Sequence, residues 1–270
     1  MSSELGLAPS FSGHAKESNM TPEILEEFVQ QNKIPVTDTN LRGRCVDGRY
    51  DAEDLENFPV ISKPGAASGD VMAAFGALNL LGKSLPNETV LNAVIAVEGG
   101  PDKFFFHTDH SAETADAGCG MGCGHMKKAL LEAEAYGLSQ DQIEYLFTKL
   151  PDLLEQSSKQ EVLQGDHQES AVVIVESKDF GLKPMRTTGD EVQQVFVYQK
   201  TLHEQQLDQL ARKLQGELAA LGEVVEEQQI RHALDQAFAL QIGATLARLA
   251  KGLPIYSVKL TPENTEINSL

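Results

Sequence analysis

All three cysteines of this 270-residue chain lie in two short segments that contain glycine. Cys45 belongs to CVDGR, and Cys119 and Cys123 belong to GCGMGCGH, which follows the segment FFFHTDHS. Thiolates and imidazoles at short spacing are typical zinc ligands. So few cysteines favour thiolate ligands or a reactive thiol over a disulfide framework. The first hypothesis is therefore a metal centre.

The charge balance excludes several classes of partner. The chain has 40 acidic and 22 basic side chains and a formal net charge of −18. A basic surface for nucleic acid is therefore not expected, and an anionic membrane surface would repel the protein. The sequence contains no run of 18 apolar residues, and its first residues lack the basic and apolar regions of a secretory leader. We expect a cytoplasmic protein that binds neither nucleic acid nor membrane.

Helix and strand patterns alternate along the chain. Thr21 as N-cap and Pro22 at the first position predict a helix over 21–32, with Ile24, Leu25 and Phe28 on its packing face. Residues 58–82 read as a strand, a glycine-containing turn and a helix from about Asp70, which is apolar nearly all round and therefore buried.

Periodicity and capping signals also predict helices and strands in the rest of the chain. An apolar run at 90–97 precedes a buried strand over 103–110. Helices are expected at 139–150, 202–221 and 230–252, and strands at 170–177, 192–199 and 253–260. The predicted fold class is α/β, a mixed sheet flanked by helices. Residues 21–262 are expected to form one metal-binding catalytic domain, preceded by a disordered or loosely docked segment, 1–20, and followed by a tail, 263–270.

The segment CVDGR carries chemistry beyond its cysteine. Cys45, Asp47 and Arg49 alternate, so an extended chain would place the three side chains on one face. Cys45 could then bind a metal while Asp47 and Arg49 pair beside it. The alternative is a buried cysteine followed by a surface ion pair. The small-residue loop 64–69 could offer backbone N–H groups to an anion such as bicarbonate.

Four segments in this order, CVDGR, a loop beginning with PG, HTDHS and GCG, resemble the cadmium- or zinc-using zeta-class carbonic anhydrases and, more distantly, the beta class. The resemblance implies a carbonic anhydrase-like (beta/zeta) fold with Cys45, His107 and one cysteine of a GCG turn as metal ligands. Cys123 is preferred because a predicted helix follows it directly, and Cys119 is the alternative. The chain departs from the family in having two GCG turns, both further from His107 than the family's single turn.

The resemblance also implies an activity. A family member catalyses the reversible hydration of carbon dioxide to bicarbonate by a metal-bound hydroxide, with Zn²⁺ bound, and thiolates also accept Cd²⁺ or Co²⁺. Asp47, oriented by Arg49, would accept a hydrogen bond from that hydroxide. Candidates for proton transfer to solvent are His110, Asp109 and His125. A homo-oligomer is a possible assembly.

Three other functions use parts of the same pattern. A hydrolase of carbon disulfide or carbonyl sulfide would keep the same ligands. A non-catalytic metal-binding or interaction protein would keep the cysteines without the open position or the Asp47–Arg49 dyad. A redox thiol pair would use Cys119 and Cys123, although their spacing is CxxxC rather than CxxC.

Overall fold

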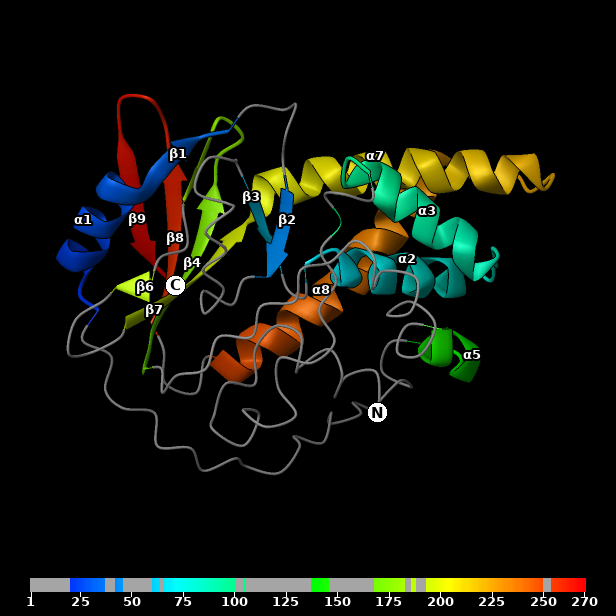
Figure 1. The fold of residues 1–270 in the computed structure, drawn as a ribbon, viewed down its shortest axis with the longest axis horizontal. Helices are drawn as coiled ribbons and strands as arrows, with labels where there is room; N and C mark the ends of the chain where they lie inside the picture. Colours follow the sequence, from blue (N-terminus) through cyan, green and yellow to red (C-terminus); the bar gives the residue numbers. More distant parts are fainter. Residues whose placement is uncertain are drawn as a thin grey trace, which may run out of the picture.

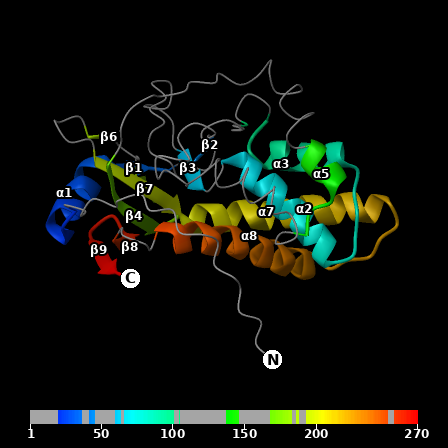
Figure 2. The same ribbon diagram turned by 90° about the horizontal axis from the view of Figure 1, so that it is seen from below.

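The structure is a computed structural model, and it describes residues 20–36, 42–45, 60–63, 66–100, 104, 137–145, 168–182, 186–187, 193–249 and 254–270. Within these ranges the chain is a mixed α/β protein (Figure 1). A sheet with helix α1 (Pro22–Asn32) lies at one end of the long axis, and the helices α2 (Ala67–Leu80), α3 (Asn87–Val97), α7 (Lys200–Ala220) and α8 (Glu227–Leu249) lie at the other, as both ribbon views show (Figures 1 and 2).

In the described part of the chain, the main sheet has five strands in the order β6-β7-β4-β8-β9. Its centre is parallel, because β4 (Gln168–Glu176) pairs in parallel with both β7 (Gln193–Gln199) and β8 (Ile255–Leu260). Its edges are antiparallel: β6 (Arg186–Thr187) pairs with β7, and β9 (Thr265–Ser269) pairs with β8. Residues 263–270, expected as a tail, therefore contribute an edge strand.

Two smaller strand pairs accompany this sheet among the residues that the structure describes. β2 (Arg42–Cys45) runs parallel to β3 (Val60–Lys63), and β1 (Lys33–Pro35) runs antiparallel to β5 (Phe180–Leu182). In both ribbon views the β2–β3 pair lies between the main sheet and the helices.

Helix α1 (Pro22–Asn32) starts as the sequence predicts. The Thr21 hydroxyl accepts a hydrogen bond from the Ile24 N–H at 3.4 Å, and Pro22 opens the helix. Leu25 and Phe28 are buried against strands of the main sheet, together with Val29. The prediction that Ile24 lies on the packing face is wrong. This residue is 42% exposed, because the buried stripe follows the i, i+3, i+4 spacing from Leu25.

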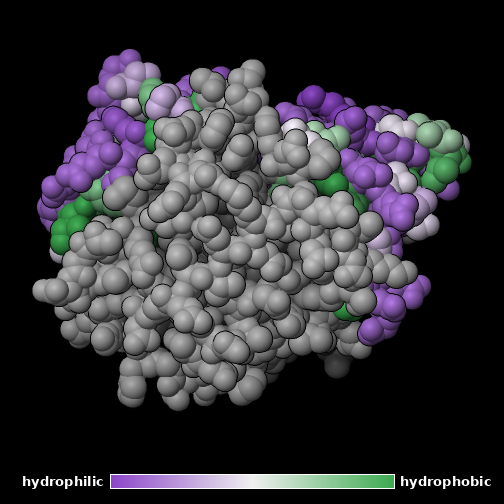
Figure 3. Space-filling model, viewed as in Figure 1, coloured by the Kyte–Doolittle hydropathy of each residue, from purple (hydrophilic) through white to green (hydrophobic). Residues whose placement is uncertain are grey.

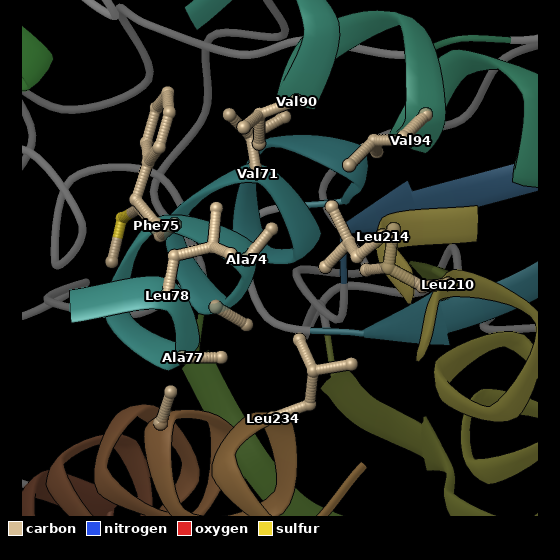
Figure 4. Close-up of a cluster of buried hydrophobic side chains, with 14 of the residues drawn as sticks. Val71, Ala74, Phe75, Ala77, Leu78, Val90, Val94, Leu210, Leu214 and Leu234 are labelled. Atoms are coloured by element: carbon tan, nitrogen blue, oxygen red, sulfur yellow. The ribbon is translucent and has the colours of Figure 1, made fainter. Parts of the chain in front are cut away.

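The helices form a second core. It joins α2 (Ala67–Leu80), α3 (Asn87–Val97), α7 (Lys200–Ala220) and α8 (Glu227–Leu249). Figure 4 shows side chains from all four helices pointing toward one another, among them Val71, Val94, Leu214 and Leu234. Every residue of α2 from Ala67 to Leu78 is buried, which confirms the prediction of a buried helix. The apolar run at 90–97 lies within helix α3.

The turns that follow α2 and α7 have similar geometry, and we call them the two corners. Gly82 after α2 and Gly222 after α7 both have positive φ, 62° and 81°, and the following N–H donates to a carbonyl five residues back. Lys83 and Glu223 form an ion pair between the corners. Hydrophobic residues gather at this end of the described surface (Figure 3), where Leu221 is 61% and Val224 is 89% exposed.

Most of the other described helices and strands lie where the sequence predicts them. α5 (Gln140–Glu144) begins after Ser139, whose side chain and that of Gln142 form a capping box. The predicted strands at 170–177, 192–199 and 253–260 are confirmed as β4, β7 and β8, and the predicted helices at 202–221 and 230–252 as α7 and α8. Among the described residues no helix is long and apolar enough to cross a membrane.

Candidate functional site

Cys45 is the one predicted metal ligand that the structure describes, as the last residue of β2. The β2–β3 register places it opposite Lys63, the last residue of β3. Both residues therefore stand at the carboxyl ends of parallel strands, the edge at which open α/β sheets present their site residues.

The other predicted site residues lie outside the described residues, so the structure does not bring them together or separate them. They are Asp47, Arg49, His107, Asp109, His110, Cys119, Cys123 and His125. Across the described ranges there is no group of three or more His, Cys, Asp or Glu residues that could hold a metal ion. Phe104, three residues before His107, is buried in the helical core.

The structure does show a buried polar cluster next to the Cys45 position. Its centre is the Lys63 ammonium group, which is fully buried. Lys63 Nζ donates to Asp70 Oδ2 and Glu98 Oε1, and to Gln206 Oε1 at 2.7 Å. An ammonium group has three N–H donors, so all three have acceptors. A buried charge normally requires such pairing.

A second chain of hydrogen bonds extends from Asp70. His203 Nε2 lies 2.9 Å from Asp70 Oδ1, and the Tyr198 hydroxyl lies 3.3 Å from His203 Nδ1. Because Asp70 accepts as a carboxylate, His203 donates through Nε2 and Nδ1 accepts from the tyrosine hydroxyl. The imidazole packs on Phe238 with ring centroids 3.9 Å apart. The cluster thus links β3, α2, α3, β7 and α7.

The bend between β3 and α2 explains how Lys63 and Asp70 come to face each other. Lys63 ends β3 and Asp70 lies in the first turn of α2, and the connection bends sharply at Ala66, where φ is 52° and ψ is −141°. A residue with a Cβ rarely adopts this conformation, which costs about 1–3 kcal/mol. Such strain is concentrated at functional sites. Gln241 of α8 also donates to the Gly69 carbonyl at 3.1 Å.

The charges in the cluster set the protonation of the lysine and the aspartate. Burial alone would raise the pKa of Asp70, but the Lys63 ammonium and the His203 hydrogen bond outweigh it and hold that pKa well below its usual range. Burial alone would lower the pKa of Lys63, yet Asp70 and Glu98 together raise it. Asp70 and Lys63 are therefore an ion pair at neutral pH.

Glu98, His203 and Tyr198 respond differently. Burial and, after it, the neighbouring Asp70 carboxylate raise the pKa of Glu98 to about 7, although Lys63 opposes this. Burial lowers the pKa of His203, so its imidazole is neutral at physiological pH. Burial, with the charges of Glu204 and Asp70, raises the pKa of Tyr198, so its hydroxyl keeps its proton. Glu98 is thus the member able to gain and lose a proton near neutrality, as a general acid or base must.

Sequence reasoning missed this cluster, although some signals were present. Asp70 is the one charged residue in the apolar segment 64–82, and His203 interrupts the apolar stripe of α7. A charge at a buried position is informative because it is costly to leave unpaired. No local pattern names the partners, however, since Lys63 and Gln206 are 143 residues apart in the chain.

Comparison with known proteins places the chain in no family: no family model, no curated protein and no solved structure matches it.

Proposed function

We propose that this protein is a metal-dependent carbonic anhydrase-like lyase that interconverts carbon dioxide and bicarbonate. The observation that carries the proposal is the position of Cys45, at the carboxyl end of a strand that runs parallel to β3, directly before the VDGR motif. Sites in open α/β sheets lie at this edge. The parallel centre of the sheet and its flanking helices support the finer proposal of a beta/zeta-type fold.

The proposed ligands are Cys45, His107 and Cys123, with Cys119 as the alternative third ligand. Two thiolates and one imidazole balance the charge of a divalent ion and suit Zn²⁺, with Cd²⁺ or Co²⁺ also acceptable. Three protein ligands leave one position open, which is the pattern of a catalytic site. When bound, the ion would supply the acidity that makes water a nucleophile at neutral pH.

Other side chains would orient the attacking group and carry protons. Asp47 would accept a hydrogen bond from the attacking oxygen, so that the lone pair of this oxygen points toward the substrate. Arg49 would hold Asp47 in place. The proton released by hydration must leave the site, and His110, Asp109 and His125 are the proposed carriers.

The experiment measures metal content and carbon dioxide hydration on the same purified sample. We expect about one zinc or cadmium ion per chain and hydration well above the buffer rate. Stoichiometric metal without hydration would point to a hydrolase of carbon disulfide or carbonyl sulfide, or to a non-catalytic metal-binding protein. A folded protein that takes up no metal would overturn the proposal and favour the thiol pair.

Variants separate the proposed roles. Cys45→Ser should lower metal content sharply, because it removes a ligand. Asp47→Ala should retain the metal and lose most of the hydration activity. Cys119→Ser and Cys123→Ser are matched to each other, and only the substitution at the true ligand should strip the metal. Full activity in Asp47→Ala would remove the dyad from the mechanism.

A further inference from the structure

Glu98 occupies a hinge-like position at the end of α3. It is the C-cap residue of that helix, and its side chain is buried. Its Oε1 accepts from Lys63, but Oε2 has no hydrogen-bond partner among the described residues. The next two residues, Gly99 and Gly100, both have positive φ, 93° and 113°. The Glu98 carboxyl is therefore half satisfied, next to a backbone that tolerates rearrangement.

The charge count around Glu98 is unbalanced. Lys63 supplies one positive charge, whereas Asp70 and an ionised Glu98 supply two negative charges. The groups that face Asp70 and Lys63 from α7 and β7 are neutral; they are Gln206, His203 and Tyr198. The positive charge of Arg231 on α8 acts on His203 and Tyr198. With both carboxyls ionised, the buried cluster carries an uncompensated negative charge, which a dry interior strongly disfavours.

We propose that Glu98 is a proton-controlled latch on the end of α3: the protonated carboxyl stays buried beside Asp70 and holds the last turn of that helix in place, and the ionised carboxylate releases it. The turn in question is secured by three backbone hydrogen bonds, from the N–H groups of Glu98, Gly99 and Gly100 to the carbonyls of Val94, Ala96 and Ile95. Release lets the Glu98 carboxylate reach water. The latch is a property of the fold and does not depend on a metal or on hydration activity.

The direction of the effect follows from linkage. The pKa of Glu98 is raised from 4.5 to about 7 in the closed state. A group whose pKa is raised on closing favours the closed state fully below pH 4.5, and this preference is lost as pH rises through about 7. With a pKa of 4.5 in the open state, opening becomes about tenfold more frequent between pH 6 and pH 8.

Hydrogen exchange tests the latch on the unliganded full chain. Protection factors for peptides that contain Glu98, Gly99 and Gly100, corrected for the intrinsic pH dependence of exchange, should fall about tenfold from pH 6 to pH 8. Glu98→Gln keeps an acceptor for Lys63 and resembles the protonated acid, so its protection should not change over this range. Glu88→Gln, at an exposed position of the same helix, is the matched control and should behave like the parent protein.

A second variant, Asp70→Asn, tests the latch independently if Glu98→Gln folds poorly. Asp70→Asn removes the competing carboxylate, so Glu98 becomes the sole anion beside Lys63 and should ionise at lower pH without opening. The fall in protection between pH 6 and pH 8 should then disappear. Corrected protection that is independent of pH in the parent protein, or a full tenfold fall in either variant, would overturn the latch.

Discussion

The ion cluster around Lys63 and the ion pairs along α7 and α8 use the same residue types in opposite environments. Lys63, Asp70 and Glu98 are buried, whereas Arg212 and Glu227, joined at 3.1 Å, are 62% and 45% exposed. Removing one partner of a buried pair leaves an unpaired charge in a dry interior, but removing one partner of an exposed pair leaves a charge in water. What a charge contributes to stability therefore depends on its burial and not on the number of ion pairs.

The largest effect is expected at the centre of the cluster. Lys63→Met leaves Asp70 without its main counter-charge, so the free energy of unfolding should fall by about 3–5 kcal/mol. Urea denaturation of the variant and the parent protein at pH 7 measures this. A loss below about 1 kcal/mol would show that the buried cluster contributes no more to stability than the surface pairs do.

An intermediate effect is expected at the edge of the cluster. Tyr198→Phe removes the hydroxyl that lies 3.3 Å from His203 Nδ1 and leaves that buried acceptor unpaired. The free energy of unfolding should fall by about 1–3 kcal/mol. The double variant Tyr198→Phe with His203→Phe tests the cause, because removing both partners should cost less than the sum of the two single changes if the groups are coupled.

The smallest effect is expected at the surface. Lys83→Met makes the same chemical change as Lys63→Met, but its partner Glu223 is 46% exposed at the corner after α7. The free energy of unfolding should change by less than about 1 kcal/mol, and by still less at high salt. Denaturation curves at two ionic strengths check this, and a loss as large as that of Lys63→Met would show that burial is not the deciding factor.

Much of the fold could be predicted from local patterns. Helices α1, α7 and α8 and strands β4, β7 and β8 lie where periodicity, N-caps and β-branched runs place them. The predictions were weaker where a pattern has two solutions. The apolar run at 90–97 fits a helix or a strand, and the polar segment TEINS is a strand only because it pairs with β8.

The proposed metal site and the buried cluster around Lys63 differ in how far the sequence reveals them. The cysteines, the histidines and the Asp47–Arg49 pair stand out in the sequence because their chemistry is rare and closely spaced, and they remain predictions. Local sequence patterns were enough to propose these residues and to predict most of the described helices and strands. That Lys63, Asp70, Glu98 and His203 share one buried site follows from the folded structure alone, because burial and charge pairing depend on contacts between residues far apart in the chain.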